Sequence, residues 1–250
     1  MKNFILMVQF LTRIPINVNL DVKEEDFRKG VIYFPLVGLI VGLINALTYV
    51  VIARLLSSTL AVVAVSLMNI LITGAFHLDG IADTCDGIFS ARKKDRMLEI
   101  MKDSQIGTNG AVAIFFDLAL RIVMLYTINE AHVVKAIIVS SIIARTITVV
   151  LMRYSVYARP DGGLGNLFIG KISRWNVIIT LVIGSLLSTL IFGYEVLIIL
   201  AVTVLFGMLF KNYITSKING MTGDTLGASN ELCEILVLLL VIIIERITIL

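Results

Sequence analysis

Long apolar runs alternate with short polar segments along almost the whole chain. Most runs approach the length of about 20 residues that an α-helix needs to cross the hydrocarbon core of a membrane. The shorter apolar segment at residues 3–12 ends near Pro15 and is predicted to be a short N-terminal helix lying at the membrane interface. The pattern predicts an all-α fold, a polytopic integral membrane helical bundle that forms one domain over residues 1–250. The seven predicted transmembrane helices cover residues 31–53, 55–76, 107–128, 132–152, 175–192, 196–210 and 232–250.

Composition supports a membrane protein over a soluble one. The chain is 58% hydrophobic and 16% charged, whereas soluble domains are about 45–50% apolar and about 25% charged. Its mean hydropathy is +0.97. The formal net charge of +3 is too small to indicate a nucleic-acid partner, so we expect the lipid bilayer as its surroundings. Cys85 and Cys233 provide no disulfide framework.

Lysine and arginine are distributed unevenly among the connections between the predicted spans. They are concentrated before the first span and in polar segments at about 77–106, 154–174 and 211–229, and are sparse in the intervening connections. Positively charged loops stay on the cytoplasmic side. We therefore predict a multi-pass cell-membrane protein with a cytoplasmic N-terminus and an external C-terminus. The three polar segments are then loops on the cytoplasmic face, where they can form one site.

The most polar segment, residues 77–110, follows the second predicted span directly. If it begins as a helix, Asp79, Asp83 and Asp86 stand at i, i+4 and i+7 and point the same way, with neighbours about 5–6 Å apart. Carboxylates that close repel one another unless they are protonated or bridged by a cation. Oxygen ligands without a Cys or His cluster favour Mg²⁺ or Mn²⁺, and Mg²⁺ is usually shared with substrate phosphates. The spacing therefore predicts a metal and diphosphate site.

Basic residues follow these aspartates closely. Arg92, Lys93 and Arg96 could neutralise the remaining phosphate oxygens. Glu99 and Asp103 again stand at i,i+4, which makes Asp103 a further candidate for a metal ligand or a base. The alternative is a solvated segment whose acids and bases simply pair, although the regular DxxxDxxD spacing beside small residues argues against it.

Several other polar residues lie within or beside the predicted spans. His77 either binds phosphate or marks the membrane boundary. Asp117 and Arg121 form an i,i+4 pair in the third span, and Arg145 lies in the middle of the fourth. Intramembrane charges are costly and are usually functional or mutually paired. The simplest interpretation is that Asp117 and Arg121 satisfy each other.

A glycine-rich turn precedes the last span. Asp224 and Glu231 flank this turn, and its glycines would let backbone N–H groups approach a phosphate at a helix N-terminus. Taken alone, the signal is weak because Gly-Asp turns are common.

Five stretches together resemble the cobalamin synthase family, whose members are adenosylcobinamide-GDP ribazoletransferases. The core is HLDGIADTCDG at 77–87, followed by RMLEIMKDSQIGTNG at 96–110. Three further stretches are similar to the family: QFLTRIP near the start, YARPDGGLG at 157–165 and TGDTLGASNE at 222–231. The resemblance covers nearly the whole chain, with the motifs in the expected order. Asp161-Gly162-Gly163 stands where the family pattern has Glu-Gly, so this loop is one residue longer.

The resemblance implies an integral membrane enzyme that requires Mg²⁺. Its substrates would be adenosylcobinamide-GDP and α-ribazole or α-ribazole 5′-phosphate, and the products would be GMP and adenosylcobalamin or its 5′-phosphate. This is the assembly of the lower nucleotide loop of vitamin B12.

Carried onto this sequence residue by residue, the resemblance gives a set of candidate site residues. Either Asp103 or Asp224 would be the general base, and the choice between them stays open. The candidate metal ligands are Asp79, Asp83, Asp86 and Asp103; the residues expected to stabilise the diphosphate are Arg92, Arg96 and Lys102; and the substrate-binding residues are His77, Arg159, Gly165, Gly223, Gly227 and Glu231.

Three alternative functions compete with this interpretation. A CDP-alcohol phosphotransferase would carry DxxDGxxAR, but here three residues separate Gly87 from Ala91-Arg92. A prenyltransferase would need a second aspartate-rich motif. A transporter would place charges along a path through the bilayer, whereas the polar residues here concentrate at one face. The choice between α-ribazole and its 5′-phosphate and the presence of a homo-oligomer also stay open.

Overall fold

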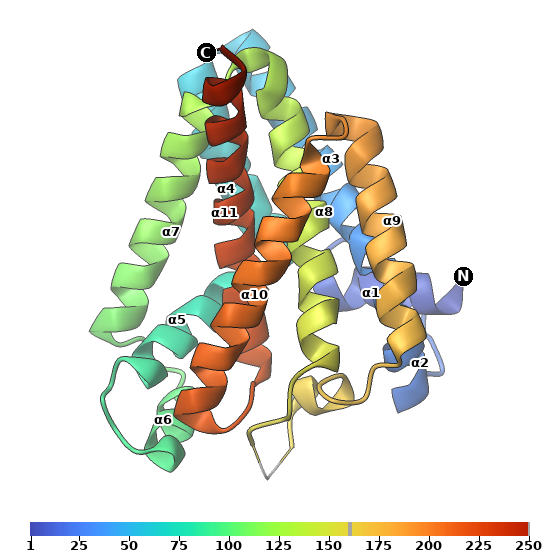
Figure 1. Ribbon diagram of the computed structural model, residues 1–250, viewed down its shortest axis with the longest axis vertical. Coiled ribbons are helices and arrows are strands. Elements are labelled where there is room, and N and C mark those ends of the chain that lie inside the picture. Colours follow the sequence, from blue (N-terminus) through green and yellow to red (C-terminus); the bar gives the residue numbers. More distant parts are fainter. Residues whose placement is uncertain (160–161, 250) are drawn as a thin grey trace.

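The computed structural model describes residues 1–159 and 162–249, and it shows a bundle of helices (Figure 1). Pro160 and Asp161, which belong to the YARPDGGLG motif, lie outside the described residues, and so does Leu250. No named strand occurs in the described chain. The helices are α1 (Lys2–Leu11), α2 (Glu24–Gly30), η1 (Val31–Tyr33), α3 (Phe34–Leu55), α4 (Ser58–Thr73), α5 (Phe76–Ile88), α6 (Lys94–Ile100), α7 (Thr108–Thr127), α8 (Glu130–Arg153), η2 (Leu164–Leu167), α9 (Arg174–Phe192), α10 (Val196–Ile218) and α11 (Gly223–Ile249).

The long helices confirm the predicted membrane bundle. Within the described residues, six helical stretches are long and apolar enough to cross a membrane, and the bent pair of α4 and α5 would make a seventh. Helix α8 runs through the centre and is almost wholly buried, whereas α7, α9 and α10 expose much of their apolar surface. Exposed apolar side chains on outer helices are what a lipid environment requires. The short N-terminal helix is also confirmed as α1, which buries one face against the bundle.

Helices α4 and α5 meet at a sharp corner. Gly74 and Ala75 both adopt left-handed backbone angles, with φ of 63° and 59°, and the two helix axes differ in direction by 91°. Helix α4 has 16 residues, which gives a length of about 24 Å. The first helix of the predicted second span therefore ends at Thr73, and α5 turns from it toward the polar end of the bundle (Figure 1).

Two of the three predicted polar loops are largely helical: the helix that the aspartate spacing assumed at 77–86 is confirmed, whereas the prediction of a loop at 211–229 was wrong in its local structure. Most of 77–106 forms α5 and α6, and 211–229 contains the end of α10 and the start of α11. Lys211 and Lys217 suggested a loop, but both belong to α10: Lys211 Nζ donates a 3.2 Å hydrogen bond to the carbonyl oxygen of Tyr154, and Lys217 lies over the ring of Tyr213. The three segments nevertheless meet at one end of the bundle, opposite the C-terminus (Figure 1).

Candidate active site at the polar end of the bundle

Helices α5 and α11 cross in close backbone contact, and this contact positions the acidic residues. A Cβ atom on Gly80 would lie 2.7 Å from the backbone oxygen of Asp224, and one on Gly227 would lie 3.3 Å from Cα of His77. Glycine at both positions therefore allows the two helices to touch. As a result, the α5 face that carries Asp79 and Asp83 lies beside Asp224.

These carboxylates create a site with excess negative charge. Asp83 is half-buried, and its burial together with the charges of Asp79 and Asp224 raises its pKa to about 7. Arg159 opposes this shift, and its Nη2 donates a hydrogen bond of 2.6 Å to Oδ2 of Asp224. Arg159 Nη2 also lies 3.4 Å from the carbonyl oxygen of Met101, so it links three polar segments. Because one guanidinium group cannot neutralise three carboxylates, the site keeps a net negative charge that favours a cationic ligand.

Asp86 has a structural role that its spacing did not indicate. Its two carboxylate oxygens accept hydrogen bonds from the backbone N–H groups of Gly107 at 2.7 Å and Gly110 at 2.8 Å, at the start of α7. A Cβ atom on either glycine would lie 2.4 Å from a carboxylate oxygen of Asp86. The IGTNG sequence thus lets Asp86 cap the N-terminus of α7.

The described residues fit a metal ion that is shared with its substrate better than one held by the protein alone. Within residues 1–159 and 162–249, no three His, Cys, Asp or Glu side chains are already gathered around one point. Mg²⁺ is usually held by one or two carboxylates together with substrate phosphate oxygens. Asp79 and Asp83 can supply that number of ligands.

Asp103 lies outside a helix, which contradicts the predicted helical pairing with Glu99. Helix α6 ends at Ile100, because the chain then turns toward α7, and Asp103 Oδ1 accepts a 3.0 Å hydrogen bond from the N–H of Gln105. Glu99 instead pairs with Arg96 at 2.8 Å on the exposed face of α6. Lys102 is also exposed.

The predicted diphosphate-binding residue Arg92 lies in the connection between α5 and α6. Together with Lys93 and Lys94 it lines an open hollow, which Tyr213 and Lys217 at the end of α10 complete. The hollow is basic and exposed, so it can receive an anion from solvent.

The YARPDGGLG and TGDTLGASNE motifs lie side by side. Tyr157 and Met221 form an isolated parallel β-bridge, in which Met221 donates to Val156 O at 2.8 Å and accepts from Ala158 N at 3.0 Å. A Cβ on Gly165 would lie 2.8 Å from the backbone nitrogen of Gly223. This pairing places Arg159 and Gly165 next to the start of α11.

Four of the six predicted substrate-binding residues line one largely apolar cavity. They are His77, Gly165, Gly223 and Gly227. Arg159 lies beside the carboxylates, so the structure gathers five of the six residues around the start of α11. The aromatic residues of this cavity were not predicted, because single phenylalanines in apolar helices carry no distinguishing signal.

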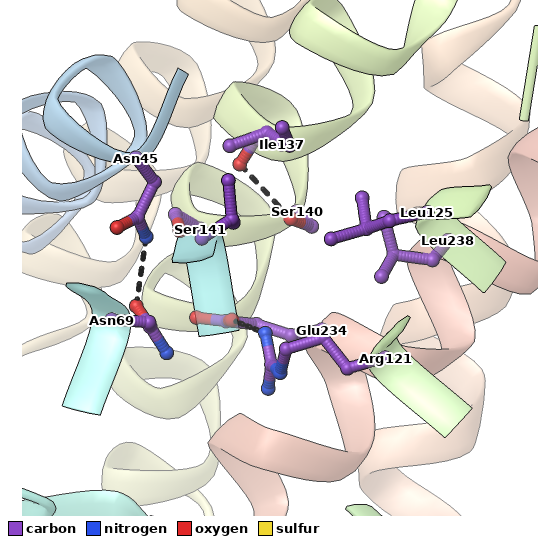
Figure 2. Close-up of a pocket in the computed structure, with 10 residues that line it drawn as sticks. Asn45, Asn69, Arg121, Leu125, Ile137, Ser140, Ser141, Glu234 and Leu238 are labelled. Carbon is purple, nitrogen blue, oxygen red and sulfur yellow. Dashed lines mark hydrogen bonds and ion pairs between the residues drawn. The ribbon is translucent and has the colours of Figure 1, made fainter. Parts of the chain in front are cut away.

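Glu231, the sixth, belongs to a buried ionic cluster inside the bundle; Figure 2 shows two other members of this cluster, Arg121 and Glu234. Arg121 of α7 donates hydrogen bonds of 2.5 Å to both Glu231 and Glu234 of α11. Arg145 of α8 donates to Glu234 at 3.0 Å. Asp117 lies 3.7 Å from Arg121, so the predicted i,i+4 pair is only one part of a network that joins three helices.

Glu234 was missed by the sequence analysis. It lies within the predicted last span, and an acidic residue there is itself a signal of pairing. A small polar cavity adjoins the cluster, where Asn45 donates a 2.9 Å hydrogen bond to Asn69 (Figure 2). Its volume of about 10 Å³ is close to the space that one buried water needs.

The fold and the site together define a polytopic membrane protein with a carboxylate-rich site and an adjoining apolar cavity at one end of its bundle. Residues 3–242 match the family model of cobalamin-5-phosphate synthase, and the chain belongs to that family. A relative from Clostridium novyi (strain NT) is 54% identical over 239 residues, which cover 96% of each chain. A relative from Thermoanaerobacter sp. (strain X514) is 39% identical and covers 95% of this chain and 96% of its own. Both relatives are named adenosylcobinamide-GDP ribazoletransferase. No solved structure matches the chain.

Proposed function

We propose that this chain transfers the adenosylcobinamide phosphate group of adenosylcobinamide-GDP to α-ribazole or to its 5′-phosphate. A ribose hydroxyl of the acceptor attacks the phosphorus atom that carries the corrinoid. The bond from this phosphorus to the bridging oxygen breaks, that oxygen leaves with GMP, and the hydroxyl proton passes to a base. The observation that carries the proposal is the match to relatives of this name over 95% or more of both chains.

The residues at the polar end have distinct roles in this proposal. Asp79 and Asp83 would hold a Mg²⁺ ion, or Mn²⁺ in its place, beside the diphosphate of the donor. When bound, such an ion would neutralise the negative charge that develops on the transferred phosphoryl group. Arg159, held by Asp224 at 2.6 Å, stabilises the remaining negative charge. Asp224 is the better-placed candidate base, since it lies beside Asp79 and Asp83, whereas Asp103 lies in the turn that follows α6.

The proposal includes a cytoplasmic active site. The basic residues of the α5–α6 connection and of the end of α10 lie at the same end of the bundle as the carboxylates. Positive charge of this kind favours the cytoplasmic side.

One experiment tests both the reaction and its sidedness. Sealed inverted membrane vesicles that contain the protein are given adenosylcobinamide-GDP and α-ribazole, with Mg²⁺ or with EDTA. We expect GMP release without detergent, dependent on both substrates and abolished by EDTA. Release only after permeabilisation would contradict the cytoplasmic site. Absence of release from folded protein under all conditions would contradict the transfer reaction.

A further inference from the structure

The open hollow between the α5–α6 connection and the end of α10 carries positive charge that no neighbouring carboxylate neutralises. Its cationic lining residues come from both sides: Arg92, Lys93, Lys94 and Lys217. In the part of the chain that the structure describes, none of these four side chains forms an ion pair. Charges of one sign that lie close together repel one another. The hollow therefore favours an anionic ligand.

The walls of the hollow are partly apolar, and its size suits a ligand larger than a simple ion. Its volume is about 630 Å³, within the range of about 300–1,000 Å³ that is typical of ligand pockets. Ile88, Phe89 and Met97 contribute apolar surface, and the side chain of Phe89 is 60% exposed. A ligand with an anionic part and an apolar part would contact both kinds of wall.

An exposed row of side chains on α10 leads into the hollow. The row has one residue every four positions, so it forms a single ridge about 18 Å long: Leu205, Leu209, Tyr213 and Lys217. The two leucines are 61% and 59% exposed, and Lys217 Nζ lies 5.5 Å from the centroid of the Tyr213 ring. Aliphatic residues followed by a tyrosine and then a lysine match the order of hydrocarbon, interface and headgroup in a membrane leaflet. The hollow is therefore at the depth of the lipid phosphates.

We propose that this hollow binds the phosphate of an anionic phospholipid, one acyl chain of which lies along Leu205 and Leu209. Basic pockets beside spanning helices recognise anionic headgroups in this way. A nucleotide would contact the cations but would leave the exposed leucine row unused. A phosphatidylcholine headgroup carries a quaternary ammonium group, which four unpaired cations would repel. Because α6 packs against the end of α10 (Figure 1), the bound lipid contacts both helices.

The test titrates delipidated full-length protein in a neutral detergent with dioleoyl phosphatidylglycerol, dioleoyl phosphatidylcholine or GMP. The double variant Lys94→Gln/Lys217→Gln removes one cation from α6 and one from α10. Lys23→Gln/Lys29→Gln is the matched control, because both lysines are exposed at α2, at the same end of the bundle (Figure 1). Leu209→Ala keeps all four cations and shortens the apolar row. Native mass spectrometry gives the number of bound lipids and their Kd, and thermal unfolding shows that each variant is folded.

We expect wild type to bind one phosphatidylglycerol more tightly than phosphatidylcholine, and GMP not to displace it. The double variant in the hollow should bind phosphatidylglycerol about tenfold or more weakly, and Leu209→Ala about threefold more weakly, whereas the control variant binds it as wild type does. Equal affinity of wild type and the folded double variant for phosphatidylglycerol would overturn the proposal. Displacement of the lipid by GMP, together with loss of GMP binding in the double variant, would also overturn it, because the hollow would then be a nucleotide site.

Discussion

The carboxylates of Asp83 and Asp86 lie one helical turn apart on α5 and have different surroundings. Asp83 is half-buried beside Asp79 and Asp224, and this raises its pKa. Asp86 uses both oxygens to hold the first turn of α7. Substitution at these two positions should therefore affect different properties.

We expect Asp83→Asn to lower GMP release by about 100-fold or more without lowering the unfolding midpoint, because the amide keeps the shape of the side chain and removes its repulsion with Asp79 and Asp224. Asp86→Ala should instead destabilise the protein by about 0.5–2 kcal/mol through loss of a helix cap. Thermal unfolding in detergent and GMP release measure the two effects, with the exposed Asp21→Asn as control. A fully stable Asp86→Ala, or an unfolded Asp83→Asn, would contradict this division of roles.

Among the helices, α11 connects the catalytic end to the interior. Its first turn carries Gly223 and Asp224 at the site, and three turns later Glu234 accepts hydrogen bonds from Arg121 of α7 and Arg145 of α8. Both arginines are at most 5% exposed. The cluster therefore fixes the position of α11 between two neighbouring helices, and through it the position of Asp224 against α5.

Removing the charge of Glu234 should destabilise the bundle. Glu234→Gln leaves two buried guanidinium groups short of one negative charge, and breaking a buried pair in this way costs about 3–5 kcal/mol. We expect a markedly lower unfolding midpoint in detergent. Glu245→Gln is the control, because Glu245 pairs with His132, whose side chain is 43% exposed. An unchanged midpoint for Glu234→Gln would show that the cluster does not hold the helices together.

At the scale of the whole molecule, the hydrophobic pattern predicted the number and order of the long helices well. It failed in two places. The predicted second span ran through the corner at Gly74 and Ala75, because these residues are small and carry no polar signal, and the polar residues at the end of α10 and the start of α11 suggested a loop where the chain is helical. A transmembrane helix is predicted from the length of its apolar segment, so the polar continuation of a helix beyond the membrane is not predicted as helical.

The site could be predicted only in part. The aspartate spacing and the glycine motifs identified residues that the fold brings together, because their signals are local. The cap that Asp86 forms on α7 spans 21 and 24 residues, and the cavity combines six helical segments. Contacts between segments so far apart in the sequence produce no regular spacing of residues, so they could not be predicted from the chain alone.

The central claim is that one enzyme joins the corrinoid phosphate to α-ribazole at this site. The most direct test supplies purified protein with adenosylcobinamide-GDP, labelled α-ribazole and Mg²⁺, and measures GMP release and label incorporation into the corrinoid together. We expect equal molar amounts of released GMP and incorporated label, with the label joined through a phosphodiester. GMP release without incorporation of the label would show hydrolysis in place of transfer and would contradict it.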